Sequence, residues 1–485
     1  KYCNLNISDI DTVAFHAEYF NFKNRLKNFF IHYFNYCPKI VFKNHHLCHA
    51  ASAFYSSGFL NSCILTADFS GDGISTGLYV AKNKKIKVFK TFKKPQSLGV
   101  FYSLVTQLLG FRRDTDEYKV MGMSSYGKPV INLDWLIKKT NGGYNLEEKY
   151  LAKLNKSENL LPTKQEPIYN SKILKKINFN PSNIKKYNSK HFNFAASAQN
   201  TLNNLSLHLV RHLQKHFKSK NLCVAGGVGL NCVMNKSFLD NLDISNLFVQ
   251  PASSDSGTAL GAAYLAANEK GIKISKLKNV YLGNSFSEKN IFSILQNSSA
   301  KFKKVKNPHK IAAKLISKNK IVGWFQGRHE YGPRALGCRS ILANPRSRQM
   351  KDIINKKVKF REQFRPFAPS CLIEDASKFF KLNNQKEFPF MTTTVDVIKN
   401  QRSKIPSVTH VDGTARLQTV SKDQNKLFYN LISEFKKITK IPIVLNTSFN
   451  VKGEPIVNTP VQAIATFFST GMDALFIGNF YLKKK

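Results

Sequence analysis

The sequence has few acidic residues, no paired-cysteine motif and no long hydrophobic run. Only 30 residues are Asp or Glu, against 74 Lys and Arg. Its eight cysteines form no C-x-x-C pair. This argues against a disulfide framework in a chain of this length and favours a reducing compartment. The sequence shows neither a run of about 18 apolar residues nor a signal peptide. These absences predict a cytoplasmic protein without a membrane partner.

The shortage of acidic residues leaves a formal net charge of +44. A balance this basic is typical of proteins that bind nucleic acid or an anionic membrane. Here, however, the lysines are spread along the whole chain and mixed with Asn, Ile and Phe, as in 172–190 and 301–320. We interpret this as a compositional bias with most lysines solvated, and we do not expect a nucleic-acid partner. A polyanionic partner remains the alternative.

The pattern of apolar residues predicts an α/β protein of two domains. Residues 193–217 and 256–267 have the periodicity of helices, and a polar segment that begins at Asn268 holds few core candidates. We therefore predict domains at 1–275 and 280–485, with a polar insertion near 139–190. Strands are predicted at short β-branched runs that alternate with helices: 62–67, 77–80, 222–225, 247–249, 321–325 and 443–445.

The segment "NHHLCHAASAF" predicts a metal site. His45 and His49 are four residues apart, so on a helix they share a face and can bind one divalent metal. Further candidate ligands are Asp68, where a buried strand meets a glycine-rich turn that also holds Asp72, and Asp255, at the start of a small-residue helix. The alternatives are incidental helical histidines and ordinary turns.

Two other segments of the first half could form a polar ligand site. "DEYKVMGMSSYGK" places Glu117 and Lys119 beside apolar residues, and "AGGVGLNCVMN" places Gly226, Gly227 and Asn231 between a strand and a helix. Glycines there allow close approach of the backbone to a ligand, and the following helix start favours an anion. A solvated helix start and a plain strand–helix connection are the alternatives.

The second half concentrates groups that bind phosphate. Arginine is scarce in this lysine-rich chain, yet it recurs in "GRHEYGPRALGCRS" and "NKKVKFREQFRPFAP", and its planar fork suits phosphate oxygens. "VLNTSFN" adds a polar turn after a strand, which can hold a small anion. The candidates are Arg328, Arg334, Arg339, Lys359, Arg365, Asn446, Ser448 and Asn450.

Taken in order, these motifs resemble the O-carbamoyltransferase family, whose members modify nodulation factors and antibiotics. The resemblance extends along the whole chain, through "HHLCHAASAF", "EYKVMG", "GPRALGCRSILANPR", "REQFRPFAPS", "HVDGTARLQTV" and "LNTSFNVKGEPIV". It implies an N-terminal domain of the actin/hexokinase type. It also implies a C-terminal α/β domain similar to threonylcarbamoyl-adenylate synthase.

The resemblance also implies a reaction. The C-terminal domain would convert carbamoyl phosphate and ATP, with Mg²⁺, to carbamoyl-adenylate, and the N-terminal domain would pass the carbamoyl group to a hydroxyl of a small molecule. The metal is usually iron, with His45, His49, Asp68 and Asp255 as candidate ligands. His46 and Arg334 are the catalytic candidates, and the remaining residues named above would contact nucleotide and carbamoyl phosphate.

One departure from the family concerns the start of the chain. Family members begin with a strand and turn that contain a Gly-His-Asp-type motif, and this sequence starts after it. We therefore expect an incomplete first lobe and weak transfer activity. Two other functions stay open, namely a tRNA-modifying carbamoyltransferase and a non-catalytic nucleotide- or sugar-binding protein of the same fold. The acceptor and a homodimer are also left open.

Overall fold

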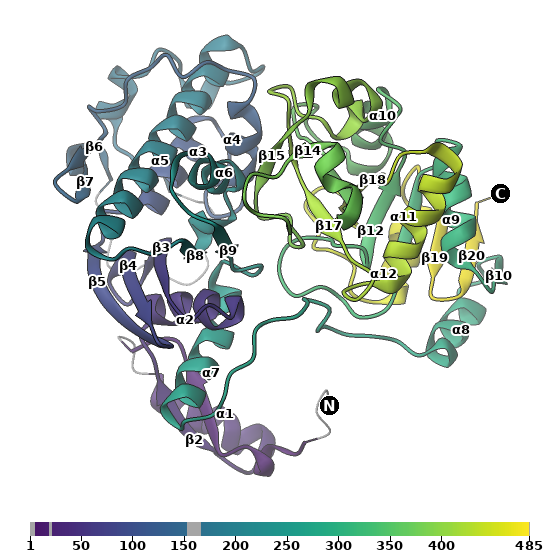
Figure 1. Cartoon of the computed structure of the whole chain (residues 1–485), viewed down its shortest axis with the longest axis horizontal. Coiled ribbons are helices and arrows are strands. Elements are labelled where there is room, and N and C mark those ends of the chain that lie inside the picture. The colour runs from purple at the N-terminus through teal and green to yellow at the C-terminus, as the bar shows by residue number, and fades with distance from the viewer. Residues whose placement is uncertain (1–4, 19–21, 153–165, 485) are drawn as a thin grey trace. The chain divides into compact units, whose positions relative to one another are not determined.

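Two units of mixed helix and sheet make up the chain, which a computed structural model describes at residues 5–18, 22–152 and 166–484 (Figure 1). The first unit is Lys1–Leu277 and the second is Lys278–Lys485. The division lies in the polar segment where the sequence analysis placed its domain boundary. Each unit has its own sheet, and the α/β class predicted from the sequence is confirmed.

A five-stranded sheet forms the centre of the first unit. Its order is β5-β4-β3-β8-β9. The first three strands are antiparallel neighbours, whereas β3, β8 and β9 run parallel. Four of these strands coincide with apolar runs picked out in the sequence. Their bounds are β3 (Ser62–Gly71), β4 (Ile74–Lys82), β5 (Lys85–Lys93), β8 (Asn221–Ala225) and β9 (Asn246–Val249).

Helices cover both faces of this sheet. The helices α2 (His45–Ser57) and α7 (Thr258–Glu269) share one apolar cluster with alternate strand residues such as Ile64 and Cys223. The intervening residues Leu65 and Val224 are buried as well and face the other side, because strand side chains alternate. The helices α3 (Leu98–Leu108) and α5 (Ser189–His216) contact the sheet there.

The first turns of α2 and α7 approach unusually closely. A Cβ atom added to Gly261 of α7 would lie 1.8 Å from the carbonyl oxygen of Cys48 in α2. Glycine is therefore required at this crossing, because any side chain would push the helices apart. The crossing therefore fixes the position of Asp255–Gly257, the turn before α7, relative to the start of α2.

The remaining elements of the first unit are smaller. A parallel pair, β1 and β2, is joined by α1, and β6 pairs with β7 in the region where the sequence predicted an insertion. Residues 153–165 of that predicted insertion lie outside the described residues. The bounds are β1 (Thr12–Phe15), α1 (Lys23–Phe34), β2 (Lys39–Phe42), α4 (Glu117–Ser124), β6 (Ile137–Thr140), β7 (Gly143–Leu146) and α6 (Cys232–Asn241).

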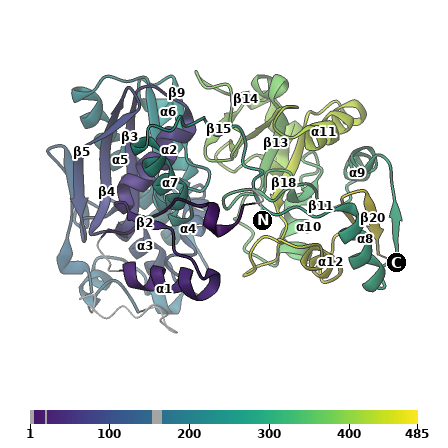
Figure 2. The same cartoon turned by 90° about the horizontal axis from the view of Figure 1, so that it is seen from below.

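An eight-stranded mixed sheet forms the second unit (Figure 2), in the order β10-β20-β19-β11-β12-β18-β13-β17. Its central strands β12 and β18 carry the predicted phosphate-binding residues Arg339, Asn446 and Ser448. The bounds are β10 (Phe302–Lys304), β11 (Val322–Phe325), β12 (Arg339–Ala343), β13 (Ala368–Leu372), β17 (Gln418–Val420), β18 (Ile443–Ser448), β19 (Ala474–Ile477) and β20 (Phe480–Lys483).

Helices and a small second sheet complete this unit, with α9 and α11 lying side by side against the large sheet. The three-stranded sheet has the order β14-β15-β16. The bounds are α8 (Glu288–Asn297), α9 (Pro308–Ser317), α10 (Met350–Ile354), β14 (Phe380–Lys381), β15 (Thr394–Val397), β16 (Thr414–Arg416), α11 (Lys426–Thr439) and α12 (Pro460–Phe468).

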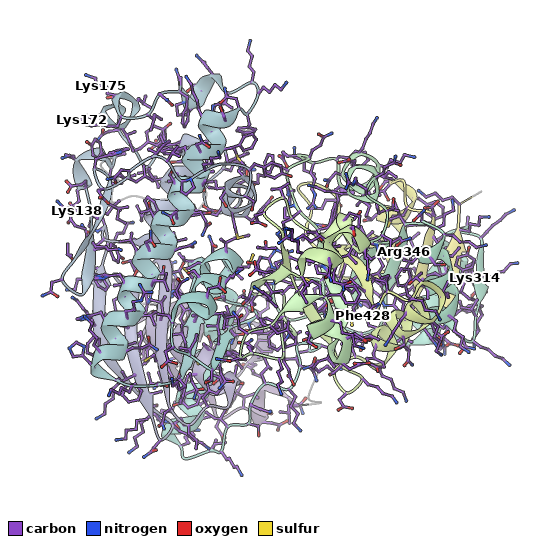
Figure 3. All side chains as sticks on the ribbon, turned by 45° about the horizontal axis from the view of Figure 1, so that its top comes forward. Lys138, Lys172, Lys175, Lys314, Arg346 and Phe428 are labelled. Atoms are coloured by element: carbon purple, nitrogen blue, oxygen red, sulfur yellow. The ribbon has the colours of Figure 1, made fainter. Side chains whose placement is uncertain are left out.

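The lysine and cysteine side chains that the structure describes lie as the composition led us to expect, with most lysines in solvent and the cysteines outside disulfides. Lys138, Lys172, Lys175 and Lys314 are exposed and point outward (Figure 3), as expected for solvated lysines. The seven cysteines of the described ranges are all free. Within those ranges, no helix has both the length and the apolar character needed to cross a membrane.

Replacing Gly261 with Ala should lower the free energy of unfolding of the first unit. Overpacking of a tight contact costs about 1–3 kcal/mol, which outweighs the gain of about 1 kcal/mol in helix propensity. Urea unfolding followed by circular dichroism measures the change. Ala263→Ser, at an exposed position of the same helix, is the control. An unchanged midpoint for Gly261→Ala would show that the two helices separate at no cost.

Candidate functional site

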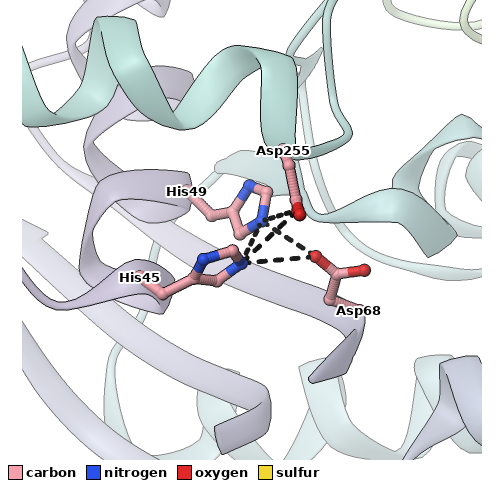
Figure 4. A group of neighbouring side chains, drawn as sticks. All are labelled: His45, His49, Asp68 and Asp255. Carbon is pink, nitrogen blue, oxygen red and sulfur yellow. Dashed lines mark hydrogen bonds and ion pairs between the residues drawn. The ribbon is translucent and has the colours of Figure 1, made fainter. Parts of the chain in front are cut away.

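Four side chains of the first unit converge on one point (Figure 4). Their ligand atoms all lie within 4.8 Å of one another. The two Nε2 atoms of His45 and His49 are 3.1 Å apart, and His49 Nε2 lies 2.9 Å from Asp68 Oδ2. Asp255 Oδ1 lies 3.5 Å from each imidazole Nε2. The structure thus brings together all four metal-ligand candidates chosen from the sequence.

Three elements hold these side chains in place. Both histidines belong to the first two turns of α2, and the side chain of Asn44 caps this helix by accepting from Leu47 N. Asp68 lies in β3, where Ser97 Oγ donates to the Asp68 carbonyl and Gly99 approaches the same peptide. Asp255 lies in the short turn that leads into α7.

The charges of the cluster are strongly coupled. Burial disfavours protonation of His45, but hydrogen bonds that its imidazole donates to Asp255 and Asp68 outweigh burial and raise its pKa to about 9. The pKa of His49 is raised by the same two carboxylates against its burial. Burial of Asp68 is likewise outweighed by the two histidines, which hold its pKa well below the usual range. Without a metal, then, protons on the imidazoles balance the carboxylates.

The donor set fits a divalent transition metal. Two imidazole nitrogens that lie 3.1 Å apart, together with two carboxylate oxygens, make a mixed N/O set that suits iron, manganese or zinc. The side chain of Asp255 is 67% exposed, whereas those of His45, His49 and Asp68 are largely buried. One side of the cluster is therefore open, as a catalytic site requires and a closed structural site does not.

His46 does not join this cluster, which argues against the role of general base predicted for it. Its side chain is fully buried, and its Nδ1 hydrogen-bonds Thr66 Oγ1 at 2.8 Å. Burial, followed by the neighbouring His49, lowers its pKa to about 3. A base works best with a pKa near the operating pH. The helical rotation of about 100° per residue turns His46 away from the face shared by His45 and His49.

The predicted nucleotide residues fall into three groups. Gly226 and Gly227 lie beside the cluster, since a Cβ at Gly227 would be 3.0 Å from Asp68 Oδ1. Asn231 instead caps α6 and exchanges hydrogen bonds with Gln199, so its amide is already engaged within the fold.

Glu117 and Lys119 both contact residues of their own part of the chain. Glu117 accepts from Ser103 Oγ and from the backbone N–H of Asp114, and burial raises its pKa. Lys119 Nζ lies 3.0 Å from Asp116. These contacts hold the segment in place, and Met121 of the same helix contacts Cys232, the residue after Asn231.

In the second unit, the buried Lys359 contacts two other predicted residues, Ser448 and Asn450. Lys359 Nζ donates to Asn450 Oδ1 at 2.7 Å, to the Asn450 carbonyl at 2.9 Å and to Ser448 Oγ at 3.2 Å. Within the described part of the chain its acceptors are all neutral. Burial lowers its pKa, and the nearby Arg361 and Arg365 lower it further. Arg365 also pairs with Glu362 at 3.7 Å, so one carboxylate lies among the three cations and the excess positive charge favours an anion here.

Arg339 does not contribute to such a site, contrary to its predicted contact with phosphate. Its side chain has no exposed surface and stacks on Phe325 at 3.7 Å. Its guanidinium donates to the carbonyls of Gln326, Cys338, Asn284 and Gly327. The arginine therefore organises the interior around the start of β12.

The loop between β11 and β12 holds Arg328 and Arg334, both half-buried. One oxygen of the buried Glu330 shapes this loop by accepting from the backbone N–H groups of Leu336, Cys338 and Arg339. Asn446 of β18 donates to the carbonyl of Ala335 at 3.1 Å. Asn446 thus lies next to the Arg334 segment, whereas Arg365 pairs with Glu362 at 3.7 Å.

Sequence reasoning missed several neighbours of these sites. The ring of His16 lies 5.6 Å from that of His45, although nothing in the sequence near His16 signals this. Gln199, in the middle of the long helix α5, holds Asn231, and the sequence around Gln199 gives no sign of this contact. Ser370, which the sequence did not single out, contacts the Asn446 amide together with Gln418, a residue that the sequence did single out in the "HVDGTARLQTV" motif.

Comparisons with known proteins show the family of the chain. A family model described as "Carbamoyltransferase N-terminus" matches residues 16–264, and one described as "Carbamoyltransferase C-terminus" matches 313–484. "Nodulation protein NolNO" of Sinorhizobium fredii is 40% identical over 92% of this chain and 64% of its own length. "Nodulation protein NolO" of Bradyrhizobium diazoefficiens is 38% identical over 91% of this chain and 79% of its own length.

Solved structures add little to this assignment. A structure described as "Crystal structure of T.kodakarensis HypF" aligns with 52% of this chain and 40% of its own, at 12% identity and a TM-score of 0.31. A likeness this low supports no argument about the fold or the site. The matches to the two family models and to the relatives carry the assignment, and the chain belongs to the carbamoyltransferase family, as its motifs predicted.

Proposed function

We propose that the chain is an O-carbamoyltransferase that makes carbamoyl-adenylate from carbamoyl phosphate and ATP and transfers the carbamoyl group to a hydroxyl of a small molecule. The observation that carries this proposal is the convergence of His45, His49, Asp68 and Asp255 within 4.8 Å in a chain of this family. NolNO and NolO are named as nodulation proteins, which favours a sugar-containing acceptor.

Adenylate formation is assigned to the second unit. ATP and carbamoyl phosphate bring several negative charges together, so the step needs fixed cations at the phosphate oxygens. Lys359 is held by Ser448 and Asn450, and none of its acceptors among the described residues is a carboxylate. Arg365 lies close enough to affect its pKa. We infer that this group, with Arg328 and Arg334, binds the phosphates, and that Asn446 contributes from β18.

Transfer to the acceptor is assigned to the first unit. A bound metal, Fe²⁺ in this proposal, supplies Lewis-acid polarisation of carbonyl or phosphate oxygens. The open side at Asp255 gives substrates access, while Gly226 and Gly227 let a nucleotide approach next to Asp68. The order of the five-stranded sheet, with three antiparallel strands followed by two parallel ones, supports an actin/hexokinase-type half.

His49→Ala should remove most of the bound metal. Changes to residues that merely support a metal ligand already lower affinity by about 10–100-fold, so loss of a buried ligand should cost at least as much. Metal content after equilibration with Zn²⁺ or Fe²⁺, measured by mass spectrometry, gives the answer. His32→Ala, on the exposed surface of α1, should leave it unchanged. Equal metal content in both variants would remove His49 from the ligand set.

Lys359→Met should reduce the ATP–pyrophosphate exchange that depends on carbamoyl phosphate. Methionine keeps the length of the side chain but loses a charge-assisted contact, which contributes about 1.5–3 kcal/mol, or about 10–100-fold in rate. Lys356→Met, exposed on the same segment, is the control. Exchange at the wild-type rate in Lys359→Met would show that the lysine only supports the fold.

Metal affinity should increase with pH. Without metal, His45 has a pKa of about 9 and is protonated at neutral pH, whereas a ligand must be deprotonated to bind. Affinity should therefore rise by about tenfold per pH unit for each proton displaced, and the contribution of His45 should level off above its pKa. Zn²⁺ titration between about pH 6.5 and about pH 8, with calorimetry in two buffers to count protons, measures this. A flat profile would contradict the ligand assignment.

A further inference from the structure

An aspartate beside the four-residue cluster contacts backbone instead of joining the ligand set. Asp72 lies in the turn between β3 and β4, and its side chain is almost fully buried, at 8% exposure. Its Oδ2 atom accepts from the backbone N–H of His45 at 2.8 Å and from that of Glu18 at 3.1 Å. The four side chains whose ligand atoms converge do not include Asp72.

These two hydrogen bonds connect three parts of the fold that surround the cluster. The turn that holds Asp72 continues the strand that carries Asp68. His45 is the first residue of α2, and Glu18 lies two residues after His16, whose ring is near that of His45. A carboxylate at a helix start also interacts favourably with the helix dipole and satisfies an N–H group that the helix itself leaves without an acceptor.

The same turn presses directly on the His45 ring. A Cβ atom at Gly71 would lie 2.1 Å from Cδ2 of that ring. The backbone of His45 is therefore held by Asp72 and its imidazole is held by the backbone at Gly71, so both ends of the residue are fixed to the strand that carries Asp68. The distance between these two ligands follows from this single turn.

We propose that Asp72 is a positioning residue for the metal centre, which sets metal affinity by fixing His45 relative to Asp68. This inference rests on the metal centre proposed above. Groups that orient metal ligands without touching the metal change affinity by about 10–100-fold when they are replaced. Such groups usually contact the side chain of the ligand, whereas Asp72 contacts the backbone N–H group of His45.

The test compares two substitutions chosen for the backbone of this residue. Asp72 has φ of +49°, a region that glycine and asparagine tolerate and most residues do not. Asp72→Gly removes the carboxylate without adding backbone strain, whereas Asp72→Asn keeps an oxygen that can accept from His45 N. Asp134→Gly, an exposed loop position of the same unit, controls for the general effect of glycine.

Each variant of the full chain is titrated with Co²⁺, whose visible absorption spectrum reports coordination geometry. Asp72→Gly should bind Co²⁺ about 10–100-fold more weakly with an altered spectrum. Asp72→Asn should stay within about threefold of wild type, because a neutral acceptor retains most of the bond. The thermal midpoint of the metal-free variants shows whether the fold is intact.

The outcomes separate this inference from the metal centre itself. If the wild-type chain binds no Co²⁺, the metal centre fails and the role of Asp72 fails with it. If the wild-type chain binds and Asp72→Gly binds equally well with an unchanged spectrum, only the positioning role is wrong. An equal loss of affinity in Asp72→Asn and Asp72→Gly would also overturn it, because the hydrogen bond to His45 N would then be irrelevant.

Discussion

The close crossing of α2 and α7 is the constraint on which the candidate metal centre depends. Gly261 lets the first turn of α7 touch the Cys48 carbonyl, and this contact places the turn with Asp255 against the helix face that carries His45 and His49. Asp68 joins them because α2 also packs on β3. Four ligand atoms from three distant parts of the chain can meet only if these helices cannot slide.

Electrostatics explains why such an arrangement favours a cation. Two buried carboxylates repel each other, and two imidazole nitrogens 3.1 Å apart cannot both carry a proton directed at the other. Without metal the cluster is balanced by protons that the carboxylates hold on the histidines. In the second unit the imbalance has the opposite sign, because Lys359 is surrounded by neutral oxygens and by arginines. One unit is thus prepared for a cation and the other for an anion.

Much of this could be read from the sequence, because the signals are local. The four-residue spacing of His45 and His49 and the apolar runs of β3 and β8 needed only periodicity, and the family followed from the motifs. Arg339 and His46 were misjudged because residue type reveals chemistry but not direction. An arginine in a phosphate-like motif can point inward to carbonyl groups, and a histidine next to a ligand is rotated away by the helix. The glycine-rich turn with Asp72 was visible in the sequence. The contacts of Asp72 with His45 N and of Gln199 with Asn231, however, join distant segments, which no local pattern records.

The buried Glu330 has a consequence for how the second unit can vary. One of its oxygens accepts three backbone N–H groups, those of residues 336, 338 and 339, so the chain between them has a fixed length. Surface loops generally tolerate inserted and deleted residues. Here a single inserted residue would move all three N–H groups out of register together. The stretch from Glu330 to Leu336, which carries Arg334, should therefore tolerate a change of side chain more readily than a change of length.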